Sequence, residues 1–318
     1  MADVKLVISD CDHTDIPEER AVFEKAGLDY AWYHCKTEDD VIRECQGAVA
    51  MLNQYAPITE RVLQALPSLR MVVRYGVGVD NIDLEAAARH GVQVCNVPDY
   101  GMNEVADHAL ALMMCLTRKL YSIMPLVKAG VWDYTKTIPI HRTAIETVGI
   151  IGLGRIGQAF AKRVHALGSR VIAYDPYLKQ PPFDYVEMVS KQALLQSADV
   201  VSLHCLLNDE TRDIIGEKEL RLMKPEAVLI NVARGGLLNE EALEKAIQEK
   251  WIAGAGIDVV KSESLARGHF LLGYENLLVT PHMAWYSEEA AVELTRKCAE
   301  EAARFLTGEK VHYPVNKV

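Results

Sequence analysis

The sequence lacks the cysteine and histidine patterns that mark a disulfide framework or a zinc site. Its cysteines form no Cys-x-x-Cys pair, and their number is odd. Single cysteines of this kind are typical of reduced thiols in the cytoplasm. Ten histidines are present, but no His-Glu-x-x-His motif and no Cys/His zinc spacing, so the sequence predicts no metal site. The cysteines are Cys11, Cys35, Cys45, Cys95, Cys115, Cys205 and Cys298.

Basic residues are in the minority, and long apolar segments are missing. Lysine and arginine number 34 against 44 aspartate and glutamate residues, which gives a formal net charge of −10. Such a protein is not expected to bind nucleic acid or an anionic membrane non-specifically. The longest uncharged apolar segment, residues 109–116, is too short to span a bilayer. The N-terminus leads into a strand-like segment, residues 5–8, without signal-peptide architecture, so we expect a cytoplasmic protein.

Short apolar segments alternate with helical patterns along the chain, which at 318 residues is long enough for two domains. This alternation predicts an α/β fold with parallel sheets covered by helices on both faces. Thr37, Thr59 and Asp83 stand where they would cap helices of the first series. The predicted strands are 5–9, 29–33, 47–51, 71–74 and 92–95 in the first series, and 148–151, 170–174, 200–203, 228–231, 254–257 and 277–279 in the second.

Two long helical patterns accompany these series. One covers residues 103–121 and is rich in alanine, leucine and methionine; the other follows Ser287 and runs to about Phe305. They are the expected crossings between two domains, which would make the first domain discontinuous. Apolar residues surround most of the 103–121 pattern, more than one face of a surface helix requires. We therefore expect a homodimer formed largely through the second domain, with burial between the two domains as the alternative.

A glycine-rich turn lies between a predicted strand and a predicted helix. Residues 148–151 run directly into residues 152–157, Gly-Leu-Gly-Arg-Ile-Gly. Gly152 permits a tight turn, Gly154 lets a pyrophosphate approach the backbone, and Gly157 lets the helix lie close to the strand. The N–H groups of a helix N-terminus attract phosphate. Glycines alone often mark turns without a ligand, but strand, turn and helix in this order predict a dinucleotide-binding site.

An acidic residue, Asp175, ends the next apolar segment, residues 170–174. A carboxylate there can accept both ribose hydroxyls of an adenosine and would repel a 2′-phosphate, which favours NAD over NADP. Because Pro176 follows, a solvated turn aspartate is the alternative interpretation.

Four further segments occur in a fixed order with the glycine turn. They are residues 74–83 (Arg-Tyr-Gly-Val-Gly-Val-Asp-Asn-Ile-Asp), 231–236 (Asn-Val-Ala-Arg-Gly-Gly), 256–263 (Gly-Ile-Asp-Val-Val-Lys-Ser-Glu) and 280–285 (Thr-Pro-His-Met-Ala-Trp). Their order and spacing resemble the D-isomer-specific 2-hydroxyacid dehydrogenases over nearly the whole chain. Among the branches of that family, residues 282–288 look most like the C-terminal-binding-protein corepressors, which retain a dehydrogenase fold.

The resemblance implies two doubly wound parallel-sheet domains. A Rossmann-type NAD domain, residues 103–286, would be inserted in a flavodoxin-like substrate domain formed by residues 1–102 and 287–318. It further implies an NAD-dependent oxidoreductase that interconverts a small D-2-hydroxy acid and its 2-oxo acid. The alternative is an NAD(H)-sensing corepressor-like scaffold with weak dehydrogenase activity.

The resemblance assigns catalysis to Arg234, Glu263 and His282, and the chemistry agrees. Reduction of a 2-oxo acid generates an alkoxide, which needs a nearby proton donor such as His282. A carboxylate on the far imidazole nitrogen, from Glu263, would orient the ring and favour its protonated form. The planar fork of Arg234 suits a substrate carboxylate. Taken singly, each residue is also compatible with an ordinary loop or surface position, and Ser264 stands where the family usually has a proline.

The remaining implied contacts concern the substrate and the cofactor. Arg74 and Tyr75 flank a loop whose backbone N–H groups would meet the substrate carboxylate, with a packed or solvated side chain as the alternative for each. Tyr100 and Trp285 are candidate walls for the 2-substituent, although large aromatics more often belong to the core. The loop is formed by Gly76, Val77 and Gly78. The implied cofactor contacts are Gly152, Gly154, Arg155, Ile156, Gly157, Asp175, His204, Cys205, Val232, Ala233, Arg234, Asp258 and His282. For His204 a strand-end histidine satisfied within the fold is the alternative, and for Asp258 a turn cap.

Overall fold

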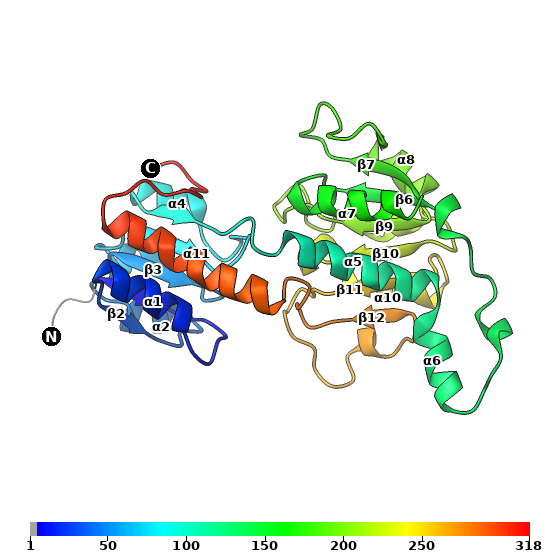
Figure 1. Cartoon of the computed structure of the whole chain (residues 1–318), viewed down its shortest axis with the longest axis horizontal. Coiled ribbons are helices and arrows are strands. Elements are labelled where there is room, and N and C mark those ends of the chain that lie inside the picture. The colour runs from blue at the N-terminus through cyan, green and yellow to red at the C-terminus, as the bar shows by residue number, and fades with distance from the viewer. Residues whose placement is uncertain (1–4) are drawn as a thin grey trace. The chain divides into compact units, whose positions relative to one another are not determined.

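The computed structural model describes residues 5–318, and the chain divides into two compact units (Figure 1). Unit 1 comprises Ser287–Val318 together with the described residues up to Gly101, and unit 2 is Met102–Tyr286. Each unit contains its own parallel sheet. The fold class predicted from the alternating pattern is thereby confirmed.

Unit 1 has a five-stranded sheet in the order β2-β1-β3-β4-β5. The chain adds β2 on one side of β1 and then β3, β4 and β5 on the other side, so the strand order reverses between β1 and β3, as in flavodoxin-like folds. Its strands are β1 (Leu6–Ile8), β2 (Tyr30–Trp32), β3 (Ala50–Asn53), β4 (Met71–Arg74) and β5 (Gln93–Cys95). Its helices are α1 (Pro17–Ala26), α2 (Glu38–Glu44), α3 (Glu60–Ala65), α4 (Leu84–Arg89) and α11 (Glu288–Leu306).

Helix starts in unit 1 follow the predicted caps in most cases. Thr37 and Asp40 form a reciprocal capping box at α2, and Asp83 accepts a hydrogen bond from the backbone N–H of Ala86 at α4. Ser287 caps α11 in the same way, so this prediction is also confirmed. Thr59 precedes α3, but its side chain makes no capping hydrogen bond.

Unit 2 has a seven-stranded sheet in the order β12-β11-β10-β9-β6-β7-β8. The chain starts in the middle at β6, builds outward to β8, and returns through β9 to the other edge, which is the doubly wound Rossmann order. Its strands are β6 (Thr147–Ile151), β7 (Arg170–Tyr174), β8 (Val186–Met188), β9 (Val200–Leu203), β10 (Val228–Asn231), β11 (Gly254–Ile257) and β12 (Leu277–Val279). Its α-helices are α5 (Met102–Thr117), α6 (Leu120–Lys128), α7 (Arg155–Ala166), α8 (Lys191–Ser197), α9 (Glu217–Leu220) and α10 (Glu240–Gln248), and its 3-10 helices are η1 (Tyr134–Thr137), η2 (Thr143–Ile145), η3 (Gly235–Leu237) and η4 (Phe270–Leu272).

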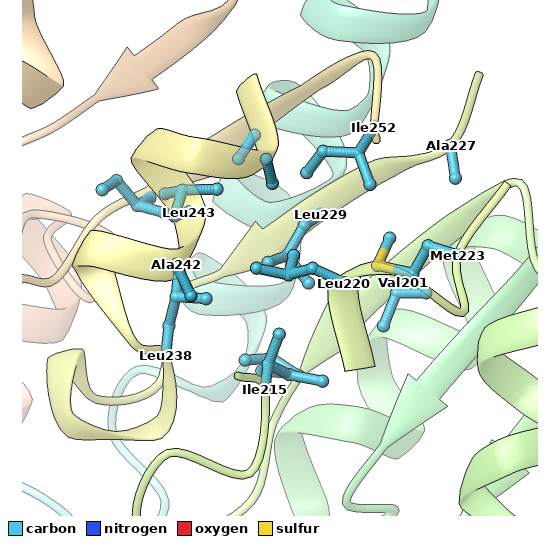
Figure 2. Close-up of a cluster of buried hydrophobic side chains, with 14 of the residues drawn as sticks. Val201, Ile215, Leu220, Met223, Ala227, Leu229, Leu238, Ala242, Leu243 and Ile252 are labelled. Carbon is cyan, nitrogen blue, oxygen red and sulfur yellow. The ribbon is translucent and has the colours of Figure 1, made fainter. Parts of the chain in front are cut away.

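The unit 2 sheet is buried on both faces because its strands are continuous apolar runs. On one face, side chains from β9, β10, α9 and α10 point toward one another, including Val201, Leu220, Leu229 and Leu243 (Figure 2). On the other face, α5 and α7 pack against the strands through residues such as Met113 and Phe160. These two cores hold the carboxyl ends of the strands in place.

The helical pattern predicted for residues 103–121 is interrupted. α5 ends at Thr117, Lys119 adopts a left-handed backbone conformation with φ 52°, and α6 begins at Leu120. Among the described residues, no single helix is long and apolar enough to cross a membrane; α5 and α6, bent by 64°, pass that test of length and composition as a pair.

Candidate active site

Three predicted site residues lie just beyond the ends of neighbouring strands in unit 2. Arg234 follows β10, Asp258 follows β11, and His282 follows β12. Because these strands are parallel and adjacent, their carboxyl ends meet at one edge of the sheet. That edge is where ligands bind in open α/β sheets.

His282 and Glu263 form a close pair at this edge. The His282 Nδ1 atom lies 2.6 Å from Glu263 Oε2, so the imidazole N–H donates a hydrogen bond to the carboxylate. Both residues have left-handed backbone conformations, with φ 52° for His282 and 50° for Glu263. This region is costly for residues other than glycine and is frequent at functional sites. The backbone N–H of His282 donates to the carbonyl of Asp258 over 2.7 Å, which helps to hold its turn.

Asp258 holds the loop that carries His282. Its side chain is 1% exposed. Oδ1 accepts hydrogen bonds from the Thr280 hydroxyl at 2.5 Å and from the backbone N–H of Met283 at 3.0 Å, and Oδ2 accepts one from Ala284 N–H at 2.8 Å. The structure therefore shows the turn-cap arrangement that the sequence left as the alternative for Asp258. Its predicted contact with a cofactor stays a prediction.

Arg234 projects from a tight turn after β10. The buried Asn231 side chain brackets this turn: its Nδ2 donates to the Arg234 carbonyl at 2.9 Å, and its Oδ1 accepts from Ala233 N–H at 3.1 Å. A Cβ atom on Gly235 would lie 2.1 Å from the carbonyl carbon of Val260. The turn can therefore approach the β11 loop only with glycine at this position.

The glycine-rich turn after β6 has the geometry of a phosphate-binding loop. Gly152 has φ 90°, and a Cβ there would lie 2.6 Å from the backbone nitrogen of Cys205. A Cβ on Gly157 would lie 2.2 Å from the Gly152 carbonyl oxygen, whereas no atom lies within 4 Å of the Cβ position of Gly154. Gly154 also starts α7 without a side-chain cap, so the helix N–H groups face open space beside it.

Asp175 lies next to this turn at the end of β7. Its Oδ2 accepts a hydrogen bond from Leu153 N–H at 2.9 Å, and its Oδ1 accepts one from Tyr177 N–H at 3.0 Å. The carboxylate is thus fixed beside the glycine turn. A carboxylate there is well placed to distinguish a 2′-hydroxyl from a 2′-phosphate on an adenosine ribose.

In unit 1, the predicted substrate loop follows β4. A Cβ atom on Gly76 would lie 1.9 Å from Arg74 Nη1 and 3.5 Å from the Tyr100 hydroxyl, so these side chains border the loop. Tyr75 differs from its neighbours because its side chain is 1% exposed and packs inside the unit. The packed alternative describes the Tyr75 side chain, and only its backbone borders the loop. Trp285 lies in unit 2, with its ring edge-on to Tyr286 at a centroid distance of 5.6 Å.

Comparisons with known proteins decide the family. Residues 110–284 match the model of the D-isomer specific 2-hydroxyacid dehydrogenase, NAD binding domain. A glycerate dehydrogenase of Methylorubrum extorquens is 37% identical over 280 residues, covering 86% of this chain and 87% of the relative. A glyoxylate reductase of Korarchaeum cryptofilum is 37% identical over 274 residues, covering 84% and 82%. The crystal structure of a D-lactate dehydrogenase from Aquifex aeolicus complexed with NAD and lactic acid superposes with a TM-score of 0.86 at 26% identity, covering 96% of each chain.

The chain belongs to the D-isomer-specific 2-hydroxyacid dehydrogenases. It is therefore an NAD-dependent oxidoreductase that acts on 2-hydroxy and 2-oxo acids. The family identified from the sequence motifs, and the NAD cofactor predicted from the glycine turn and Asp175, are confirmed.

The residues of this dehydrogenase fit NAD at the switch point of the unit 2 sheet. The open side of Gly154 and the uncapped start of α7 suit a pyrophosphate, and Asp175 suits a ribose. His204 follows β9 on the other side of the switch point, and burial lowers its pKa to about 3, so its ring is neutral. Its Nε2 atom lies 2.8 Å from Ser202 Oγ, whereas its buried Nδ1 atom has no hydrogen-bond partner among the described residues. The alternative of a satisfied strand-end histidine therefore describes one ring nitrogen only, and the cofactor contact stays a prediction. Other predicted contacts lie at this carboxyl edge: Arg155 and Ile156 begin α7, Cys205 follows β9, and Val232 and Ala233 follow β10.

Three supporting residues of the dehydrogenase site were not found from the sequence. Asn231 fixes the Arg234 turn, and Thr280 bonds to Asp258 beside His282. His108 of α5 supports Thr280 and Asp258, because its Nε2 atom lies 2.9 Å from Thr280 Oγ1. The signal for Asn231 and Thr280 was their position at the ends of β10 and β12, directly before predicted site residues. His108 had no such signal.

Proposed function

We propose that this dehydrogenase interconverts a small D-2-hydroxy acid and its 2-oxo acid with His282 as the acid–base residue. The observation that carries the proposal is the 2.6 Å contact between His282 Nδ1 and Glu263 Oε2. It leaves Nε2 as the nitrogen that exchanges a proton with the substrate oxygen. A fixed ring with a carboxylate behind it is the arrangement that general acid–base catalysis requires.

The other residues bind and orient the substrate. Arg234 offers parallel N–H donors to a carboxylate and polarises the neighbouring carbonyl. In unit 1, the backbone N–H groups of residues 76–78 are the donors that the resemblance to the family assigns to a substrate carboxylate. The glycine turn and Asp175 would hold the cofactor, which would supply hydride chemistry: NADH would donate a hydride to the 2-oxo carbon, and NAD⁺ would accept one from the 2-hydroxy carbon. In the reducing direction His282 donates a proton to the developing alkoxide, and in the oxidising direction it accepts the hydroxyl proton.

Substrates with a small 2-substituent fit this proposal best. The relatives named glycerate dehydrogenase and glyoxylate reductase support acids of that size. The test is NADH oxidation, followed by absorbance, with glyoxylate, hydroxypyruvate, phosphorylated hydroxypyruvate and a bulkier branched 2-oxo acid. We expect turnover with the small acids and a D-configured product from those that become chiral. NADH binding without turnover on any 2-oxo acid, or an L-configured product, would contradict the proposal.

We also propose that the protein forms a homodimer through unit 2. α6 is rich in apolar residues, yet none of its side chains is buried, and Met124 is 55% exposed. Leu120 and Val127 are exposed on the same helix, and Trp132 just after it is 90% exposed. An apolar face of this kind is typical of an association surface. A second copy of the chain is the occupant that we propose.

A further inference from the structure

A buried hydrogen bond lies directly behind the predicted substrate loop of unit 1. The Tyr75 hydroxyl donates to Glu19 Oε1 at 2.8 Å. Both side chains are 1% exposed. Tyr75 is the last residue before Gly76, and Glu19 lies in the first turn of α1. The bond therefore ties α1 to the start of the substrate loop.

The surroundings of this bond fix the same segment from other sides. The buried thiol of Cys298, on α11, lies 3.6 Å from the carbonyl oxygen of Arg74. The His13 ring meets the Tyr75 ring edge-on at a centroid distance of 6.0 Å. Gly76 follows with φ 125°, a conformation that side chains rarely adopt, so the loop turns sharply just beyond this anchor. Beyond the anchor, the Gly76 carbonyl accepts a hydrogen bond from Val97 N–H at 2.9 Å, and the Val77 carbonyl accepts one from Asn96 Nδ2 at 2.6 Å.

The chemistry of Glu19 suits a neutral hydrogen-bond partner. Burial raises the pKa of the Glu19 carboxyl, and its Oε2 atom is buried with no hydrogen-bond partner among the described residues. A buried carboxylate is costly unless a cation pairs with it, so burial favours the neutral acid. Burial is the largest effect on this pKa, while the hydrogen bond from Tyr75 and the nearby His13 act in the opposite direction. The titratable and charged groups around the pair are Cys11 and His13 after β1, Glu18 on α1, Arg74 at the end of β4, and Cys298 and Glu301 on α11.

We infer that Glu19 is a positioning residue of the substrate loop. It fixes the Tyr75 hydroxyl and thereby aims the backbone N–H groups of residues 76–78 at the substrate carboxylate. The role in substrate binding rests on the proposed function; the ordering of the loop does not. Glu19 has no place in the motifs of the family, and its position on α1 gives no sequence signal.

The test compares Glu19→Ala, Glu19→Gln and Tyr75→Phe in the full-length protein. Glu19→Ala leaves the buried Tyr75 hydroxyl without its acceptor, so KM for the 2-oxo acid should rise about tenfold. NADH binding should not change, and kcat should fall less than KM rises. Glu19→Gln keeps a neutral acceptor of the same shape and should restore KM to within about twofold of the parent. Tyr75→Phe should raise KM as much as Glu19→Ala does. The double variant with Glu19→Ala and Tyr75→Phe should have a KM no higher than that of either single variant.

Hydrogen–deuterium exchange of residues 75–80 provides a readout that does not need activity. Glu19→Ala should speed exchange in this segment, and Glu19→Gln should restore protection. If the parent reduces no 2-oxo acid, the proposed function fails, and exchange still decides whether Glu19 orders the loop. Unchanged exchange and unchanged KM in Glu19→Ala, with only a lower unfolding temperature, would overturn the inference. A Glu19→Gln variant as impaired as Glu19→Ala would also overturn it.

The pH dependence of stability gives a second check. The folded-state pKa of Glu19 is raised above its ordinary value of 4.5. The stability of the neutral pair is therefore fully present below pH 4.5 and is lost as pH rises through the raised value. Glutamine does not ionise, so the unfolding temperature of Glu19→Gln should rise relative to that of the parent as pH increases. A difference that is constant with pH would show that Glu19 does not titrate in this buried site.

Discussion

His282 and Glu263 both adopt left-handed backbone conformations, although neither residue is a glycine. Strain of this kind persists only where the surroundings enforce it. Asp258 does so for His282, by accepting hydrogen bonds from the two residues that follow it. The family motif predicted that Glu263 pairs with His282. The family usually has a proline after this glutamate, and only the folded loop shows that the carboxylate reaches the ring without it.

Glu263→Gln tests the pairing of these two residues. Without the carboxylate the protonated imidazole is less favoured, so the protonated donor is lost at a lower pH. We expect the reduction rate of the variant to decline at lower pH than that of the parent, with an unchanged fold by circular dichroism. Profiles of kcat against pH for both proteins measure this. Superimposable profiles would show that Glu263 does not act through His282.

Asp175→Ala tests cofactor selection. The carboxylate beside the glycine turn repels a 2′-phosphate and accepts ribose hydroxyls. Removal of the carboxylate should weaken NADH binding by about tenfold, the loss expected for charge-assisted hydrogen bonds. It should also reduce the preference of the enzyme for NADH over NADPH. Titration of both dinucleotides by fluorescence measures the change. Equal affinity of the parent for NADH and NADPH would refute the role given to Asp175.

The position of a single residue could be predicted from the sequence where the end of a strand sets it, but the direction of its side chain could not. Arg234 and His282 follow strands of a parallel sheet, so their place at its carboxyl edge was predictable. Tyr75 also follows a strand, yet its ring points into the core toward Glu19. Side chains alternate between the two faces of a sheet only within a strand, and Tyr75 lies one residue beyond β4. The sequence therefore left both directions open for its side chain.

At the scale of elements, the strand-turn-helix unit β6-α7 was predictable because each glycine has a separate steric reason. The other strands with long apolar runs, such as β10 and β11, begin and end where predicted. β3 begins at Ala50, later than predicted, because Gly47 takes a left-handed turn before it. β8 was missed because this edge strand has only one buried residue, Val186.

Gly157→Ala tests the close packing of α7 on β6. A methyl group there would lie 2.2 Å from the Gly152 carbonyl oxygen, a backbone atom that cannot move aside cheaply. We expect a loss of about 1–3 kcal/mol in the free energy of unfolding, typical of overpacking, together with weaker NADH binding. Gly154→Ala is the comparison, because its methyl group would meet no atom within 4 Å. It should lose less stability while still weakening NADH binding; equal losses of stability would contradict this steric account.

At the scale of the whole molecule, the different environments of α5 and α6 decide where the proposed dimer interface lies. The sequence predicted one helix with apolar residues on most sides. The structure ends this pattern at Thr117 in a packed α5, which contributes Ala109 and Met113 to the unit 2 core. The exposed α6 begins at Leu120 and runs to Lys128, mostly beyond the predicted helix. Sequence periodicity could not separate them, because the break at Lys119 depends on a backbone conformation rather than on residue type.

Met124→Glu tests this association. A charge in an apolar interface is costly to bury, so the variant should be monomeric at micromolar concentration where the parent is a dimer. Val292→Glu, on α11 of unit 1, is the control because its side chain is similarly exposed, at 47%, but lies outside the proposed surface. Light scattering coupled to gel filtration measures both. A monomeric parent would refute the dimer, and a dimeric Met124→Glu would exclude α6 from the interface.

The most direct test of the account is the turnover of His282→Ala measured beside its affinity for NADH. If His282 exchanges the proton with the substrate oxygen, kcat for reduction of the best 2-oxo acid should fall by roughly a hundredfold to ten-thousandfold. NADH binding should survive, because His282 is only one of the predicted cofactor contacts. His141→Ala, which removes a surface histidine paired with Glu226, should leave both quantities unchanged. A His282→Ala variant that retains the kcat of the parent would contradict the assignment of His282 as the acid–base residue.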